Sequence, residues 1–127
     1  MQPKGIIEQA SPWSVRETID RIAAFLKDHG VTIYARIDQQ SEVHKAGREI
    51  RPLEFLLFGN PKAGGAIMEE NPKAALELPL KIIAWQDKEG KTWVAYNEAQ
   101  YIEDRYSLKH ELTLPLDLHP VIAKAIA

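Results

Sequence analysis

The feature that most constrains the fold is a short apolar run that ends abruptly at a glycine. Residues 53–58 read Leu-Glu-Phe-Leu-Leu-Phe, with Pro52 before the run and Gly59 after it. A run of this length, apolar at nearly every position, is typical of a β-strand with both faces covered. We therefore expect it to be the middle strand of a sheet. Gly59 permits the turn that follows, which a residue with a Cβ atom resists.

A helix is expected to begin directly after this strand. Asn60 suits the N-cap position, and Pro61 suits the first helical residue, where a missing N–H group costs nothing. The free N–H groups at a helix start favour an anion. The pattern therefore predicts a well-capped helix, or a helix that also binds an anion beside Asn60 and Lys62.

The remaining patterns alternate between helices and strands. Apolar residues recur at helical spacing between Ser14 and Gly30, and Ser14 with Glu17 forms a capping box. Residues 31–38 alternate apolar and polar side chains, which predicts a strand. We expect further strands at 5–10, 80–87 and 92–97, and further helices at 41–46, 61–70, 72–77, 98–106 and 117–127. Residues 107–116 are expected to be irregular.

This order of elements predicts an α+β fold, a two-layer α/β sandwich. One mixed sheet of about five strands is expected to carry helices mainly on one face. A length of 127 residues suits a single domain. We expect its core at residues 5–108 and a helical extension at about 117–127.

Composition excludes several kinds of function. The formal net charge of -2 argues against nucleic acid as a partner, and the lack of cysteine excludes disulfides and thiolate catalysis. No signal peptide or membrane-spanning run is present in the sequence, so we expect a cytoplasmic protein without a membrane partner. We expect no cofactor and no metal site, because no motif for either is present. The histidines lack metal-binding spacing and are expected to be surface or capping residues: His29, His44, His110 and His119.

Period-two alternation divides the strand residues into an aliphatic set and a set that mixes aromatic with charged side chains. We expect the aliphatic sets to lie together under the helices, because that arrangement buries the most apolar surface. Glu54, Lys81 and Arg36 would then share the other face with Trp85 and Tyr96. A buried Glu54 would need a cation, and Arg36 and Lys81 are available. Such a face suits a ligand pocket, a homodimer interface or a half-exposed surface with a solvated salt bridge.

Several segments resemble the bacterial domain-of-unknown-function family 302. They are residues 14–26, Ala35-Arg36-Ile37-Asp38, residues 58–64, residues 78–82 and Tyr96-Asn97. The resemblance covers about residues 5–108 and leaves the tail from about Leu112 outside. It implies a compact two-layer α/β domain, commonly dimeric, and brings no established reaction. Many members have histidine after the Ile-Asp pair, where this chain has Gln39, so an activity that depends on that histidine is not expected.

We therefore expect an uncharacterised domain that binds a small acidic or amphipathic ligand and is not an enzyme. The candidate ligand-binding residues are Asn60, Lys62, Glu54, Lys81, Trp85, Tyr96, Arg36 and Asp38. The alternative is a structural homodimer that associates through the aromatic and charged face or the C-terminal helix. A weaker alternative is an enzyme with Asp38 or Glu54 as its base.

Overall fold

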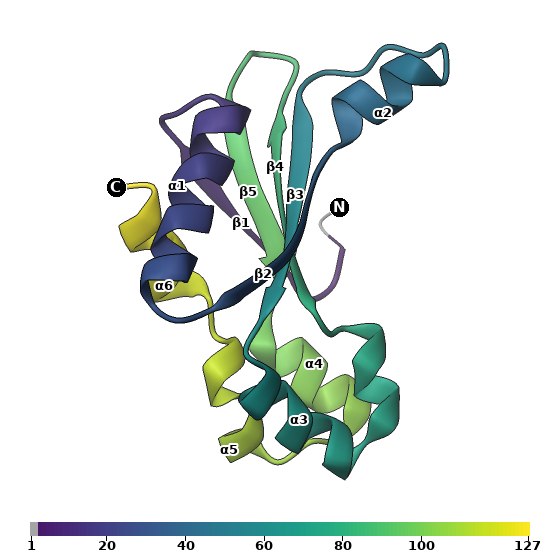
Figure 1. The fold of residues 1–127 in the computed structure, drawn as a ribbon, viewed down its shortest axis with the longest axis vertical. Helices are drawn as coiled ribbons and strands as arrows, with labels where there is room; N and C mark the ends of the chain where they lie inside the picture. The colour runs from purple at the N-terminus through teal and green to yellow at the C-terminus, as the bar shows by residue number, and fades with distance from the viewer. Residues whose placement is uncertain (1–2) are drawn as a thin grey trace.

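A computed structural model describes residues 3–127. Figure 1 shows a sheet with helices against one side and a second group of helices beyond one end of the strands. The strands are β1 (Ile6–Ser11), β2 (Thr32–Asp38), β3 (Leu53–Gly59), β4 (Leu80–Gln86) and β5 (Thr92–Asn97). The helices are α1 (Val15–Asp28), α2 (Gln39–Lys45), α3 (Pro61–Glu70), α4 (Ala99–Tyr106), α5 (His110–Thr113) and α6 (His119–Ala125), with 3₁₀ helices η1 (Pro72–Leu76) and η2 (Leu114–Leu116).

The described strands form one five-stranded sheet in the order β1-β5-β4-β3-β2. The predicted α+β class is therefore confirmed. The sheet is not mixed, because all its strand pairs are antiparallel. The expectation that β3 is the middle strand is also wrong. That place belongs to β4, and β3 is an interior strand with β2 as its outer neighbour.

Helix α1 begins as its capping pattern predicts. Ser14 Oγ accepts a hydrogen bond from the Glu17 N–H group at 3.1 Å. One side of the helix then buries Ile19 and Ile22 completely. The acidic residue Asp20 on this helix pairs with Arg36 of β2, at 2.6 Å between Oδ1 and Nη1. This contact attaches α1 to the sheet.

The main core lies between the sheet and a layer made by α1 and α6. Ile122 of α6 is completely buried in it. The indole Nε1 of Trp13 donates to the backbone oxygen of Ile126 at 3.0 Å, which joins the start of α1 to the end of the chain. The C-terminal helix is therefore packed into the main core.

A second, smaller core lies among the helices beyond the end of the strands (Figure 1). Ile67 of α3, Ala74 of η1 and Ile102 of α4 meet there, together with Leu108 and Leu116. Helix α3 is continuous despite its two adjacent glycines. The segment 107–116, which we expected to be irregular, forms α5 and η2.

Cross-strand partners show which strand residues share a face, because directly paired residues point to the same side of a sheet. Glu54 pairs with Ala84, whereas Lys81 pairs with Leu57. Glu54 and Lys81 therefore lie on opposite faces, and the expectation of one shared aromatic and charged face is wrong. The physical reason is that β3 is apolar on both sides, so its alternation does not identify the side under the helices.

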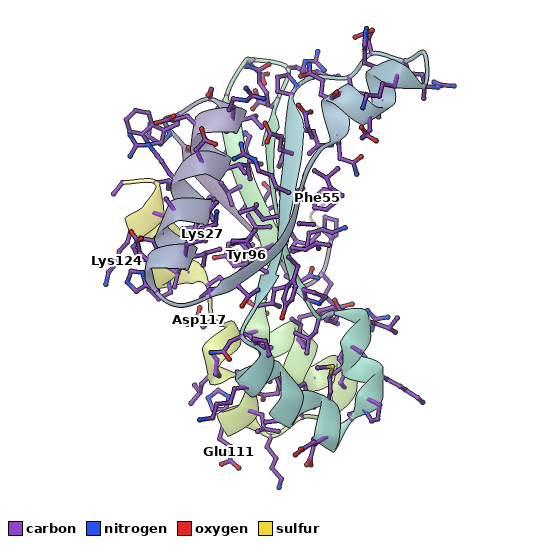
Figure 2. The ribbon with its side chains drawn as sticks, viewed as in Figure 1. Lys27, Phe55, Tyr96, Glu111, Asp117 and Lys124 are labelled. Atoms are coloured by element: carbon purple, nitrogen blue, oxygen red, sulfur yellow. The ribbon has the colours of Figure 1, made fainter. Side chains whose placement is uncertain are left out.

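We call the covered side the helix face and the other side the open face. The helix face carries Arg36, Glu54, Leu56, Phe58, Leu80, Ile82, Ala84, Val94 and Tyr96. The open face carries Ile37, Leu53, Phe55, Leu57, Lys81, Ile83, Trp85, Trp93 and Ala95. In Figure 2 Phe55 lies on the side of β3 away from α1, and Tyr96 lies on the α1 side.

Candidate functional site

An apolar cavity of about 370 Å³ lies at the end of the helix face, between the two helical groups. Segments far apart in the sequence form its wall: the end of α1, the β3–α3 junction, the segment before β4, and the chain from η2 into α6. Its lining residues include Leu26, Val31, Tyr34, Phe58, Asn60, Gly64, Met68, Leu78, Leu80, Leu116, Leu118 and Val121. The surface of this cavity is almost entirely hydrocarbon.

The β3–α3 junction forms one wall of the cavity. Asn60 Oδ1 accepts the N–H groups of Lys62 and Ala63, at 3.0 and 3.4 Å, and so fixes the start of α3. Gly64, one turn into the helix, lies beside the cavity. A Cβ atom at Gly64 would lie 3.8 Å from Leu78 Cδ1. The absence of a side chain at this position therefore leaves the cavity open.

Glu77 holds the opposite wall in place. Its Oε1 accepts hydrogen bonds from the Tyr106 hydroxyl group at 2.9 Å and from Arg105 Nη1 at 2.8 Å. Its Oε2 accepts a longer bond of 3.3 Å from Asn97 Nδ2. Because Glu77 directly precedes Leu78, these bonds fix the position of the segment that lines the cavity. Sequence analysis did not identify Glu77, since its partners lie on β5 and α4, twenty or more residues away.

An anion at the start of α3, as the sequence predicts, would find few free hydrogen-bond donors there. Pro61 has no N–H group. The next two N–H groups already donate to Asn60 Oδ1. The polar side chains that line the cavity are Asn60 and Tyr34, and Tyr34 is half exposed. Lys62 is exposed and does not line the cavity.

Arg36, Glu54 and Asp38 lie elsewhere, at the other end of the helix face. Arg36 Nε donates to Glu54 Oε1 at 3.0 Å, and the side chain of Glu54 is only 8% exposed. Burial alone lowers the pKa of Arg36, but its hydrogen bonds to Asp20 and Glu54 outweigh burial and raise that pKa. Asp38 accepts the Ser41 N–H group at 3.0 Å and caps α2. These contacts join β2, β3 and α1, which gives the cluster a structural role.

The remaining candidate residues lie apart from both places. Lys81 and Trp85 are on the open face, where Lys81 Nζ lies 4.5 Å from the centre of the Phe55 ring. Tyr96 is buried on the helix face and donates to Gln9 Oε1 at 3.2 Å. Burial, and secondarily the charge of Asp117, raises the pKa of Tyr96 to about 12. Of the candidate residues, only Asn60 lines the apolar cavity.

Sequence analysis also missed a hydrogen-bonded group on α4 and α5. Glu103 Oε1 lies 2.9 Å from His110 Nδ1 and accepts the Thr113 hydroxyl group at 2.6 Å. The spacing of seven residues crosses a helix boundary, so no periodic pattern marks it.

Among residues 3–127, no group of three histidine or acidic residues is placed to hold a metal ion. In the same part of the chain, no helix is both long and apolar enough to cross a membrane.

Curated relatives share part of their length with this chain. Proteins named fluoride-specific ion channel FluC 1, from Brucella suis biovar 1 and Brucella abortus biovar 1, are 36% identical over 104 residues. The match covers 82% of this chain, but only 41% and 38% of those proteins. The chain therefore spans about two fifths of the length of these relatives.

The fold and a family match agree with each other. A crystal structure of an uncharacterized conserved DUF302 protein from Bacillus stearothermophilus superposes with a TM-score of 0.80. The superposition covers 98% of this chain and 97% of that one at 18% identity, so it supports the fold alone. Residues 7–125 match the family described as domain of unknown function DUF302, a stretch that includes α6. This chain belongs to the DUF302 family.

Proposed function

We propose that this domain binds a small, mostly apolar molecule in the apolar cavity, with one polar group of the ligand at Asn60 and Tyr34. The observation that carries the proposal is the cavity itself. Its volume of about 370 Å³ lies within the usual range for ligand pockets, which are mostly apolar with a few polar groups. An amphipathic ligand matches this distribution of side chains.

The lining supports an elongated ligand with a mostly apolar surface. Phe58, Leu80 and Leu118 line the cavity from three separate segments. Met68 and Tyr34, which also line it, are among the exposed large hydrophobic residues of the chain. A ligand that covers such side chains gains free energy in proportion to the apolar area removed from water.

Helix α3 offers a matched pair of variants for the test. At Gly64, a Cβ atom meets only ordinary contacts, 3.8 Å from Leu78 Cδ1 and 3.9 Å from Met68 Cε, and a longer side chain extends into the cavity. At Gly65, nothing lies within 4 Å of a Cβ atom, and Gly65 does not line the cavity. Gly64→Leu and Gly65→Leu raise helix propensity equally.

The measurement is the shift of the thermal midpoint with octanol and with octanoate as probes. A ligand that binds only the folded state raises this midpoint. We expect a rise for the unmodified chain and for Gly65→Leu, and none for Gly64→Leu. The proposal fails if neither probe shifts the unmodified chain, or if Gly64→Leu responds like Gly65→Leu.

The charge of the ligand is tested by the same assay. If the thermal midpoint rises more with octanoate than with octanol, and this excess disappears in Lys62→Met, Lys62 pairs with the acidic group of the ligand.

The names of the curated relatives make fluoride a further probe. Because the lining offers few donors to a small hydrated anion, we expect sodium fluoride and sodium chloride to give the same midpoint.

The second candidate function is homodimer formation through the open face. The observation that favours it is an apolar face without a covering helix among the described residues. Neither hydrophobic core includes any residue of this face. Trp85 and Trp93 form a cross-strand pair on it, and tryptophan is enriched in protein interfaces.

Light scattering separates this candidate from a monomer. Leu57 lies on the open face, and Leu114 is 59% exposed on η2, outside the sheet. We expect the mass of a dimer for the unmodified chain and for Leu114→Lys, and the mass of a monomer for Leu57→Lys. A monomeric mass for the unmodified chain at high protein concentration would exclude the homodimer.

A further inference from the structure

A second hollow, of about 260 Å³, lies between β5, α4 and the segment that leads from α5 into α6. Its lining shares only Leu118 with the apolar cavity. Its polar lining residues are Tyr96, Glu98, Gln100, Glu103, His110, Thr113 and Asp117, and its apolar ones are Ile7, Ala99, Leu114 and Leu118. Figure 2 labels two of these residues, Tyr96 on the sheet and Asp117 lower in the view. The hollow therefore combines apolar walls with convergent polar groups.

Within this hollow, Glu103 and His110 form a carboxylate–imidazole pair. Glu103 Oε1 lies 2.9 Å from His110 Nδ1, and Glu103 Oε2 accepts from Gln100 Nε2 at 2.9 Å. The hydrogen bond from Thr113, followed by that from His110, lowers the pKa of Glu103. An ionised carboxylate only accepts hydrogen bonds. His110 Nδ1 therefore carries the hydrogen, and Nε2 of the neutral ring has a free lone pair.

We propose that His110 is a general base that activates water for the hydrolysis of a small ester or thioester in this hollow, with Glu103 as its positioning residue. Glu103 is suited to this role because three side chains fix its carboxylate and its own side chain is only 15% exposed. Hydrolysis by such a pair needs only water as a co-reactant.

The charge of the lining selects among substrates. The hollow contains the carboxylates of Glu98 and Asp117, and no lysine or arginine is among its lining residues. A negatively charged substrate is therefore repelled, and a positively charged group on the substrate is favoured. The apolar side chains of Ile7 and Leu114 suit a short acyl group. The substrate class is a small acyl ester or thioester that bears a cationic group.

The reaction is balanced with water alone. His110 Nε2 takes a proton from water as the water oxygen forms a bond to the carbonyl carbon. The tetrahedral intermediate then breaks its bond to the leaving sulfur or oxygen atom. The proton on Nε2 passes to that atom, which releases a thiol or an alcohol and leaves a carboxylic acid, and His110 is neutral again.

The chain contains a natural control for this pair. His44 Nδ1 of α2 lies 2.5 Å from Glu49 Oε1, in the segment that follows this helix, so an imidazole and a carboxylate meet there as well. The two imidazoles are equally open to water, at 70% for His44 and 71% for His110, and the pairs differ in the carboxylate, 75% exposed at Glu49 and 15% at Glu103. Helix α2 has no buried residue. A histidine–glutamate pair without a hollow is expected to give no catalysis above that of free imidazole.

Acetylthiocholine is the probe for the test, and the released thiol is measured. The protein contributes no thiol of its own, because it has no cysteine. We expect kcat/KM to fall about 100-fold in His110→Gln, a typical loss for a general base, and to be unchanged in His44→Gln. An anionic thioester, S-acetylthioglycolate, should react more slowly than acetylthiocholine.

The role of Glu103 needs a substrate without charge, because Glu103 also adds to the negative charge of the hollow. With S-ethyl thioacetate, we expect Glu103→Gln to lower kcat and leave KM unchanged. A Glu103 with only a structural role would change the thermal midpoint and leave the kcat of the folded protein unchanged. The proposal is overturned if the unmodified chain hydrolyses acetylthiocholine no faster than buffer, or if His110→Gln equals the unmodified chain.

Discussion

The two faces of the sheet are built from neighbouring residues of the same strands, yet their burial differs. On the helix face, Leu56, Ile82 and Val94 are 0% exposed. On the open face, Ile83, Trp85 and Trp93 keep intermediate exposure, although they are equally apolar or larger. The difference arises because α1 and α6 cover one face only. The open face is therefore buried only at some positions, Phe55 and Ala95 among them, and the covering helices extend burial along the interior of the helix face.

The largest expected effect that tests this comparison concerns two adjacent isoleucines of β4. Ile82 is fully buried on the helix face, and Ile83 is partly exposed on the open face. We expect Ile82→Ala to lower the free energy of unfolding by about 3–4 kcal/mol, and Ile83→Ala by about 1 kcal/mol. Urea unfolding measures both values. Equal losses would mean that the open face is as well covered as the helix face, for example by a second copy of the chain.

An effect of intermediate size is expected at the charged end of the helix face. Arg36→Met leaves the buried carboxylate of Glu54 without its 3.0 Å partner, and we expect a loss of about 2 kcal/mol. Adding Glu54→Gln removes the unpaired charge and should restore part of the loss. Arg16 lines the same surface hollow as Arg36 and Glu54. Arg16→Met is therefore the control and should change stability by less than about 0.5 kcal/mol. An equal loss in both arginine variants would contradict this role of Arg36.

The smallest effect concerns the open face and depends on pH. Trp93 Nε1 donates to Asp87 Oδ2 at 2.8 Å, and this bond is the largest cause of the lowered pKa of Asp87. A lowered pKa in the folded state stabilises the fold above the unfolded pKa, and this stabilisation is lost as pH falls through the folded pKa. Trp93→Phe should therefore lower the thermal midpoint at neutral pH and lower it less in acid.

The cross-strand partner of Trp93 provides the control. Trp85 lies opposite Trp93, and Trp85→Phe removes a similar area without removing a bond to Asp87. Its effect on the thermal midpoint should not change with pH. If the two variants show the same pH dependence, the bond between Trp93 and Asp87 is not the cause.

Local chemistry made most elements of the fold predictable. The capping residue Ser14 marked the start of α1, and Asn60-Pro61 marked the start of α3. The pairing of the faces was not predictable, because β3 is apolar on both sides and Glu54 is buried. Only the partner Arg36, which is brought over Glu54 by β2 and α1, explains why a carboxylate is tolerated there.

The candidate site was predictable in part. The segments around Phe58 and Leu78, which carried the family resemblance, both line the apolar cavity. Leu116, Leu118 and Val121 complete that lining from the C-terminal tail, which the resemblance did not include. No short-range pattern connects the tail to β3, because their contact depends on tertiary packing. For the same reason, the pairing of Glu103 with His110 across two helices was not identified.

The most direct test of the central claim is the affinity of the unmodified chain for straight-chain alcohols from butanol to octanol, measured by calorimetric titration. An apolar cavity gains about 0.8 kcal/mol for each buried methylene group, so each added carbon should lower Kd about fourfold. We predict this steady increase in affinity, and its loss in Gly64→Leu. Affinity that is absent, or that does not change with chain length, would contradict a ligand-binding cavity.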